Sequence, residues 1–140
     1  MKLDTTKIYM FNMLARHDPL DSVVHKPEHQ LALDLIIEEN KEVDDAIWDM
    51  THSADYNLSG TDEDLFKEIL DSIWVKLSYC MRRGWDVEEG FKRLGDSNLS
   101  KFNVDADGLL WAEYLPTGKV KKSANYKPVD LSDLIADKAA

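Results

Sequence analysis

The chain of 140 residues contains a single cysteine, Cys80, and no run of about 18 consecutive apolar residues. One cysteine excludes an internal disulfide and is typical of proteins that stay in a reducing compartment. The lack of a long apolar run excludes a membrane-spanning helix, and the first residues, MKLDTTKIYM, lack the apolar segment of a signal peptide. We therefore expect a cytoplasmic protein without a membrane partner.

Positive charge is also scarce, because 17 Lys and Arg stand against 27 Asp and Glu, a net charge of −10. Proteins that bind duplex nucleic acid need a basic face that neutralises the phosphates. From Ser97 onward six Lys match six Asp and Glu, so residues 1–96 carry the whole excess. The composition argues against a duplex-binding protein and separates an acidic front from a neutral end that contains several lysines.

Neither an internal repeat nor a low-complexity stretch interrupts the chain, and the spacing of apolar residues predicts four helices. They cover about residues 6–17, 27–51, 62–83 and 86–94. Thr61 is predicted as the N-cap of the third helix and Gly84 as its end. Asp86 and Glu89 resemble a capping box that starts the fourth helix, and the pattern changes after Gly95.

The segment after Gly95 has the turn residues of a small hairpin, at DADG and at PTG within DADGLLWAEYLPTGKVKK. NVDADGLLWAEY also resembles a calcium-binding loop, but Tyr114 stands at the twelfth position, where a Glu is required. The tail NYKPVDLSDLIADKAA is predicted to be extended and then to form one or two helical turns. The predicted fold is all-α, a single domain over residues 1–140. A bundle of about four core helices covers about 1–96, and the hairpin and extended tail cover about 97–140.

The second predicted helix, which contains LALDLIIEENKEVDDAIWDM, turns carboxylates toward its own apolar face. At about 100° per residue, Glu38, Glu39 and Glu42 fall in the same sector as four apolar residues. These are Leu31, Leu35, Ala46 and Met50. In the third helix Glu68 and Asp71 share a stripe with Leu65, Val75 and Tyr79 in the same way. Two helices thus present acids where a core is expected.

Two interpretations of these acids are open. The first is a solvated acidic face on each helix, which is the usual meaning of a charge run. The second is a metal site, since buried and uncompensated carboxylates destabilise a fold and raise one another's pKa. Two observations favour the metal site. Acids share the apolar face on both helices, and on the second helix Asn40, Lys41 and Asp44 already form the outer face. Ligands that are all oxygen indicate Mg²⁺, with Mn²⁺ as a substitute, and not zinc.

The acids also form a recognisable pattern, in which EENKE reads E-E-x-x-E and EILD reads E-x-x-D. Together with GWDVEEGFKRLGDSNLSKF and GKVKKSANYKPVDL, this pattern resembles the all-α nucleotide pyrophosphohydrolases, in particular the MazG-like proteins of phages and bacteria. Dimeric dUTPases and phosphoribosyl-ATP pyrophosphohydrolase belong to the same superfamily. The resemblance covers nearly the whole chain from about Leu31.

The resemblance implies hydrolysis of a nucleoside triphosphate between the α- and β-phosphates, which gives the monophosphate and pyrophosphate. By position, the implied Mg²⁺ ligands are Glu39, Glu42, Glu68 and Asp71, and Glu38 would orient or deprotonate the attacking water. The implied substrate contacts are Asn98, Lys101 and Lys127 to phosphates and Tyr126 near the nucleotide, with Asn12 as a further candidate. The four C-terminal candidates also have structural interpretations. Asn98 could cap a helix, Lys101 and Lys127 could be surface lysines, and Tyr126 could lie at the edge of the core.

The resemblance also implies a homodimer or a dimer of dimers that completes the helical core, in the cytoplasm of a bacterium or a phage-infected host. It points to the purine substrates dGTP and dATP, whereas dUTP, dCTP and phosphoribosyl-ATP are alternatives. The long lysine-rich tail after Lys101 argues against phosphoribosyl-ATP, whose enzyme is typically shorter there. A different class of function also stays open, a helical protein without enzymatic activity whose acids bind metal only to stabilise its assembly.

Overall fold

The computed structural model describes residues 2–52 and 59–135, which form two compact units that divide between Trp85 and Asp86. The first unit contains α1 (Thr6–Leu14), α2 (Pro27–His52) and α3 (Ser59–Arg82). The second contains α4 (Val87–Leu99), β1 (Asn103–Val104), β2 (Leu110–Trp111) and α5 (Ser132–Ile135). The predicted all-α class with a small hairpin is confirmed. Among the described residues, no helix is both long and apolar enough to cross a membrane.

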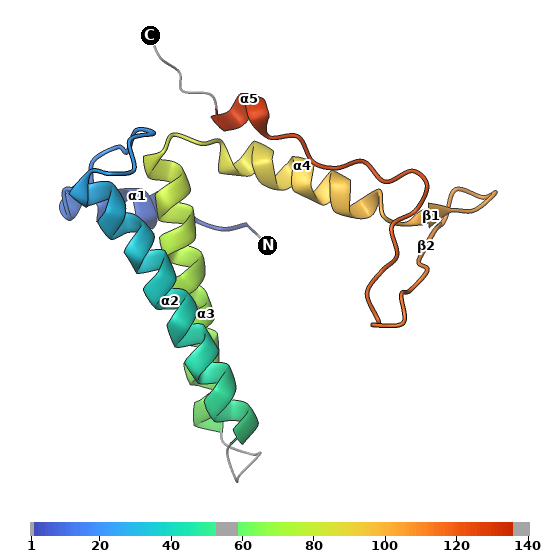
Figure 1. Ribbon diagram of the computed structural model, residues 1–140, viewed down its shortest axis with the longest axis horizontal. Coiled ribbons are helices and arrows are strands. Elements are labelled where there is room, and N and C mark those ends of the chain that lie inside the picture. The colour runs from blue at the N-terminus through green and yellow to red at the C-terminus, as the bar shows by residue number, and fades with distance from the viewer. Residues whose placement is uncertain (1, 53–58, 136–140) are drawn as a thin grey trace. The chain divides into compact units, whose positions relative to one another are not determined.

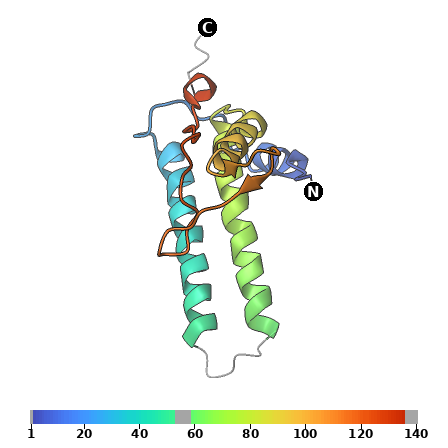
Figure 2. The same ribbon diagram turned by 90° about the vertical axis from the view of Figure 1, so that its right-hand side faces the viewer.

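In the first unit α2 and α3 run antiparallel and side by side, and α1 packs against α3 (Figures 1 and 2). Pro27 opens α2, where its missing N–H costs nothing because the first turn has no partner for it. Among the residues whose burial the structure describes, the buried apolar side chains are Ile8, Leu20, Ala32 and Leu77. Most of the described side chains on α2 and α3 are therefore at least partly exposed.

The first helix ends at Leu14, so the predicted end at His17 is wrong. Arg16 adopts the left-handed conformation, with φ of 56°, which stops helical propagation. Its N–H donates to the carbonyl of Met13 at 3.2 Å, and the N–H of His17 donates to the carbonyl of Asn12 at 2.8 Å. This Schellman pattern satisfies the last carbonyls of α1 and turns the chain toward Leu20.

The third helix begins at Ser59, so the prediction of Thr61 as its N-cap is wrong. Thr61 lies inside the first turn, because a capping signal locates a helix end only to within a residue or two. Gly84 ends α3 as predicted, with φ of 72°. The N–H of Trp85 then donates to the carbonyl of Cys80 at 3.0 Å, which completes a second Schellman pattern.

The fourth helix starts as predicted and ends later than predicted. The Asp86 carboxylate accepts the N–H of Glu89 at 3.1 Å, so Asp86 is the N-cap. The helix continues through Gly95 to Leu99, which corrects the predicted end near Leu94. Glycine costs about 1 kcal/mol in a helix interior, an amount that neighbouring packing and hydrogen bonds offset. The predicted boundary between bundle and tail at residue 96 thus falls inside a helix, and the single-domain prediction stays a prediction.

Two tight turns follow α4. Asp105 Oδ1 accepts the N–H groups of Asp107 and Leu109, both at 2.9 Å, and so holds the turn between the antiparallel strands β1 and β2. A bridge between Tyr114 and Val120 encloses the second turn, at PTG. The predicted hairpin is confirmed, and the Asp105 carboxylate serves the turn itself.

The tail then returns along α4 to α5, as Figure 1 shows. Arg93 in α4 donates to both carboxylate oxygens of Asp133 at 2.6 and 3.0 Å. Ser97 Oγ donates to the carbonyl of Lys127 at 2.8 Å, and the N–H of Lys127 donates to Ser100 Oγ at 2.9 Å. Side-chain hydrogen bonds therefore hold the tail against α4.

Candidate metal centre

Three of the acids predicted from the sequence converge between α2 and α3. One carboxylate oxygen each from Glu39, Glu42 and Glu68 lies within 4.8 Å of the others. The i, i+3 spacing places Glu39 and Glu42 on one side of α2, and the antiparallel partner brings Glu68 opposite them. Glu39 Oε2 and Glu68 Oε2 are buried and have no hydrogen-bond partner among the described residues. Such unpartnered carboxylate oxygens are available as ligands for a cation.

The raised pKa of Glu39 also favours a cation at the cluster. Burial, a hydrogen bond with Glu42 and the charges of Glu42, Asp71 and Glu68 raise the pKa of Glu39 to about 7. At neutral pH a proton therefore partly neutralises Glu39, and a cation would take over that role. Carboxylate oxygens are the ligands that hard divalent cations prefer, and one from each of Glu39, Glu42 and Glu68 would be available to such a cation. The residues fit a hard divalent cation such as Mg²⁺ or Mn²⁺.

Asp71, the fourth predicted ligand, lies beside the cluster and pairs with a lysine. Lys67 Nζ is 2.8 Å from Asp71 Oδ2 and 3.4 Å from Glu68 Oε1. The ammonium group thus neutralises part of the acidic face in the absence of metal. Lys67 was missed by the sequence analysis, although its i, i+4 spacing to Asp71 is a readable signal.

Glu38, the predicted catalytic base, is exposed and does not belong to the three-acid cluster. On the helix it lies about 100° from Glu39 and about 40° from Glu42. Its role in activating water stays a prediction.

A cavity of about 260 Å³ extends from the acids toward α1. Glu39 and Asp71 lie in its wall, together with Asn12, Phe11, Trp74 and Tyr79. A neighbouring hollow of about 490 Å³ shares three lining residues with it, namely Asn12, His17 and Arg82. A further hollow of about 420 Å³ is lined by Glu42 and Glu68. The acids therefore stand between an apolar, partly aromatic cavity and an acidic one.

The lining of the 260 Å³ cavity follows from helical periodicity on α3. Asp71, Val75, Ser78 and Arg82 recur every three or four residues and all line it. The sequence analysis named Asn12 as a candidate and missed Ser78, Arg82 and the aromatic residues. Their spacing from Asp71 is visible in the sequence, but their position beneath α1 depends on the packing of three helices.

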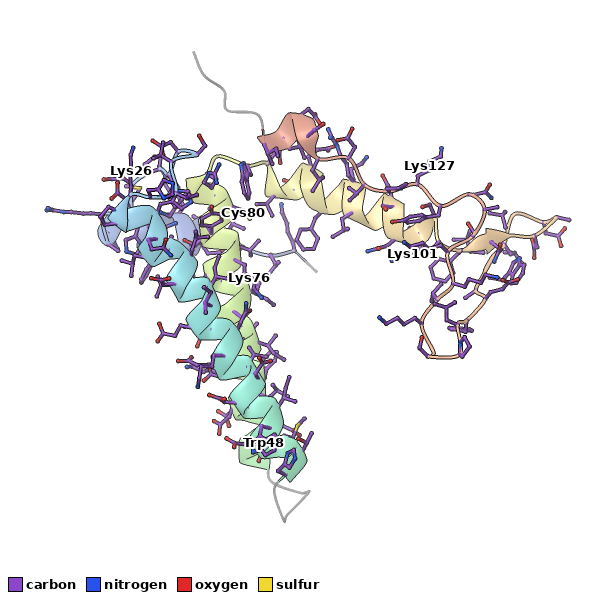
Figure 3. The ribbon with its side chains drawn as sticks, viewed as in Figure 1. Lys26, Trp48, Lys76, Cys80, Lys101 and Lys127 are labelled. Carbon is purple, nitrogen blue, oxygen red and sulfur yellow. The ribbon has the colours of Figure 1, made fainter. Side chains whose placement is uncertain are left out.

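The remaining candidates lie in the second unit, at the carboxyl end of α4. Lys101 and Lys127 both lie there (Figure 3), and neither forms an ion pair with any residue that the structure describes. Lys122 Nζ lies 4.7 Å from the centre of the Tyr126 ring, which gives that ring a cation–π partner. Asn98 is exposed in the last turn of α4. The contacts of these four residues with a nucleotide stay predictions.

The comparisons with known proteins give no indication of function. No protein-family model matches the sequence, and no curated protein matches it either. The resemblance to MazG-like proteins stays an expectation drawn from the motifs. The convergence of Glu39, Glu42 and Glu68 is the observation on which a function can be built.

Proposed function

We propose that this protein is a nucleoside triphosphate pyrophosphohydrolase that depends on Mg²⁺ and accepts Mn²⁺ in its place. It acts on a (d)NTP, with purine deoxynucleotides as the expected substrates, and releases the monophosphate and pyrophosphate in the cytoplasm. The observation that carries the proposal is the three-acid cluster with two buried, unpartnered oxygens beside a cavity of about 260 Å³. Acids that form only a solvated helix face are not expected to lie beside such a cavity.

The acids explain why the reaction requires a cation. A protein of net charge −10 repels a triphosphate, and the repulsion is strongest where three carboxylates meet. Glu39, Glu42, Glu68 and Asp71 would hold the cation, which would supply charge neutralisation for the phosphates. Asp71 joins this set when Lys67 releases it. The same Lys67 ammonium can then approach phosphate oxygens.

The chain's own residues perform the remaining steps. Glu38 orients the attacking water and accepts its proton, a role that suits a carboxylate within reach of the α-phosphorus. For the second unit we keep the roles that the resemblance implies, which are phosphate contacts for Asn98, Lys101 and Lys127 and a nucleotide contact for Tyr126. Attack at the α-phosphorus breaks its bond to the bridging oxygen, and pyrophosphate leaves with its charge already compensated.

Hydrolysis in ¹⁸O-labelled water tests which bond is cut. The label is expected in the nucleoside monophosphate and not in the pyrophosphate. Glu38→Gln should slow turnover on the order of 10²-fold or more with little change in Mg²⁺ affinity, as for loss of a general base. Label in free orthophosphate would mean cleavage at the γ-phosphate and would contradict the proposed reaction.

Self-association is part of the proposal. On α3 an apolar stripe faces away from the acids and is exposed over Phe66, Ile69, Leu70 and Ile73. Exposed apolar stripes of this length mark protein interfaces, and a second copy of the chain would cover it as a homodimer or a dimer of dimers. Sedimentation at micromolar concentration should give a species of at least twice 16.1 kDa. A 16 kDa species would contradict self-association and leave the reaction untouched.

The same stripe and acid cluster would suit a metal-stabilised helical assembly without enzymatic activity. Incubation with a panel of dNTPs and Mg²⁺ separates the two functions, since only the enzyme releases pyrophosphate. The aromatic cavity beside the acids favours the enzyme.

A further inference from the structure

His29 is a buried histidine that contacts a residue of the cavity wall without lining the cavity itself. It lies in the first turn of α2 and is only 1% exposed. Its Nε2 is 2.7 Å from the hydroxyl oxygen of Tyr79 on α3, and the two ring centres are 5.5 Å apart. Tyr79 lines the 260 Å³ cavity together with Glu39 and Asp71. His29 therefore acts on a ligand in that cavity only through Tyr79.

The hydrogen bonds of the Tyr79 hydroxyl determine which nitrogen of His29 carries the proton. Arg83 Nη1 donates to the hydroxyl oxygen at 3.0 Å, and the O–H is left to donate to His29 Nε2. In this arrangement His29 is neutral, and its Nδ1–H is the one group without a partner among the described residues. If Nε2 donated instead, both the Tyr79 O–H and Nδ1 would lack partners. The hydrogen-bond count thus assigns the proton to Nδ1.

Tyr79 is also held by the residues that end α3. The Trp85 ring meets the Tyr79 ring edge to face, with centres 5.7 Å apart. The Arg83 guanidinium carbon lies 4.7 Å from the centre of the Trp85 ring and 5.9 Å from that of Tyr79. Gly84, with φ of 72°, forms the turn between Arg83 and Trp85. His29 and the end of α3 together fix the orientation of the Tyr79 side chain.

Packing alone does not explain a histidine at this position. The Nδ1–H of His29 is a buried donor without a partner, which destabilises a fold. A phenylalanine ring would fill a similar volume and avoid that penalty. What the histidine adds is an acceptor, Nε2, for the Tyr79 hydroxyl. The chemistry of His29 therefore serves the orientation of Tyr79.

We propose that His29 is a positioning residue of the proposed reaction, which fixes Tyr79 in the cavity wall through the hydrogen bond from the hydroxyl to Nε2. The inference rests on the proposed function, which gives the cavity beside the acids to the substrate. Without the acceptor, the hydroxyl is free to turn and the Tyr79 ring loses one of its fixed contacts. The substrate then meets a wall in several orientations, so its binding weakens more than the chemical step.

Kinetics of His29 variants of the full-length protein test this role. His29→Phe keeps a ring without an acceptor and should raise KM at least about fivefold with kcat within about twofold. His29→Gln places an amide oxygen near the position of Nε2 and should keep KM within about twofold of the unchanged protein. His25→Phe makes the same change at an exposed histidine three residues before the end of the first turn and is the matched control, with both constants unchanged.

A double-mutant cycle shows whether the effect passes through Tyr79. Tyr79→Phe removes the hydroxyl and leaves the ring, so it breaks the same hydrogen bond from the other side. The KM of the double variant should therefore not exceed that of the more affected single variant, because one bond is lost in all three. If His29→Phe fails to fold, ¹⁵N NMR of the histidine rings in the unchanged protein reads the tautomer directly, with the proton expected on Nδ1.

Urea denaturation separates positioning from a structural role. His29→Phe removes an unpartnered N–H together with one hydrogen bond, so its urea midpoint should stay close to that of the unchanged protein. Four results would overturn the inference: a proton on Nε2, an unchanged KM in His29→Phe, additive effects in the cycle, or a joint loss of kcat, KM and stability.

Failure of the proposed reaction gives a different result, in which no variant releases pyrophosphate from any triphosphate. The dissociation constant of an α,β-imido deoxynucleoside triphosphate, measured by titration calorimetry with Mg²⁺, then replaces KM in the same comparison. Weaker binding by His29→Phe, with recovery in His29→Gln, would support the positioning role without turnover. Equal binding by all variants would overturn it.

Discussion

The two units of the molecule treat their polar groups in opposite ways. Residues 1–85 contain nine Lys and Arg against seventeen Asp and Glu, a charge of −8, and gather three carboxylates that leave buried oxygens unpartnered. Residues 86–140 contain eight against ten, a charge of −2, and use their polar side chains to hold turns and tail. Among the described residues, the buried side-chain atoms without a hydrogen-bond partner all lie on α2 and α3. We therefore expect the metal ion in the first unit.

The largest difference between the two units is expected when one acid is removed from each. Glu39→Gln is expected to lower hydrolysis on the order of 10²-fold or more, because the cation loses a ligand and the phosphates their neutralisation. Without metal this variant should be at least as stable as the unchanged protein, since repulsion among the acids falls. Glu113→Gln removes an exposed acid of the second unit and is the control, with activity expected to stay unchanged. Pyrophosphate release and urea denaturation check both, and equal activity of the Glu39 variant would contradict the cluster's role.

The pH dependence of stability should have opposite signs in the two units. The pKa of Glu39 is raised from 4.5 to about 7, mainly by burial, so without metal the folded state binds more protons between these values. Stability of α2 and α3 should therefore fall as pH rises from about 4.5 to about 7. In the second unit hydrogen bonds from Arg93 lower the pKa of Asp133, so its contribution is lost only as acid protonates it.

Amide hydrogen exchange, corrected for intrinsic rates, resolves the two units separately. Protection in α2 and α3 should decrease over the range from pH 5 to about 7, and saturating Mg²⁺ should remove that decrease, because the cation takes the place of the proton. Protection in α4 should stay level over the same range. A decrease in α2 that Mg²⁺ leaves intact would mean that the cation does not bind Glu39.

The smallest effect is expected at Lys67. Its ammonium group pairs with Asp71 and Glu68, and it therefore competes with a cation for the same oxygens. Lys67→Gln should tighten Mg²⁺ binding a few-fold, since an ion pair with such an exposed lysine contributes only about 0–1 kcal/mol. Lys76→Gln, on the same helix and labelled in Figure 3, is the matched control. Weaker Mg²⁺ binding in the Lys67 variant would mean that the lysine supports the site instead of competing with it.

Local rules predicted the helices and most of their ends. Gly84 and Asp86 act through their own backbone and side chain, so the end of α3 and the start of α4 could be read directly. Gly95 and Thr61 were misread, because a glycine or a capping residue is compatible with a helix that other contacts extend. The calcium-like loop and the hairpin share the same turn residues, and the missing twelfth ligand correctly favoured the hairpin.

The sequence by itself determined that acids lie on the inner faces of two helices, because a period of 3.6 residues fixes which side chains share a face. Only the tertiary structure decided which of those acids meet. It joined Glu39 and Glu42 to Glu68, left Asp71 with Lys67, and brought Ser78 to Asn12 across 66 positions of the chain. The physical reason is that contacts between helices depend on how whole surfaces pack, and no local spacing encodes that packing.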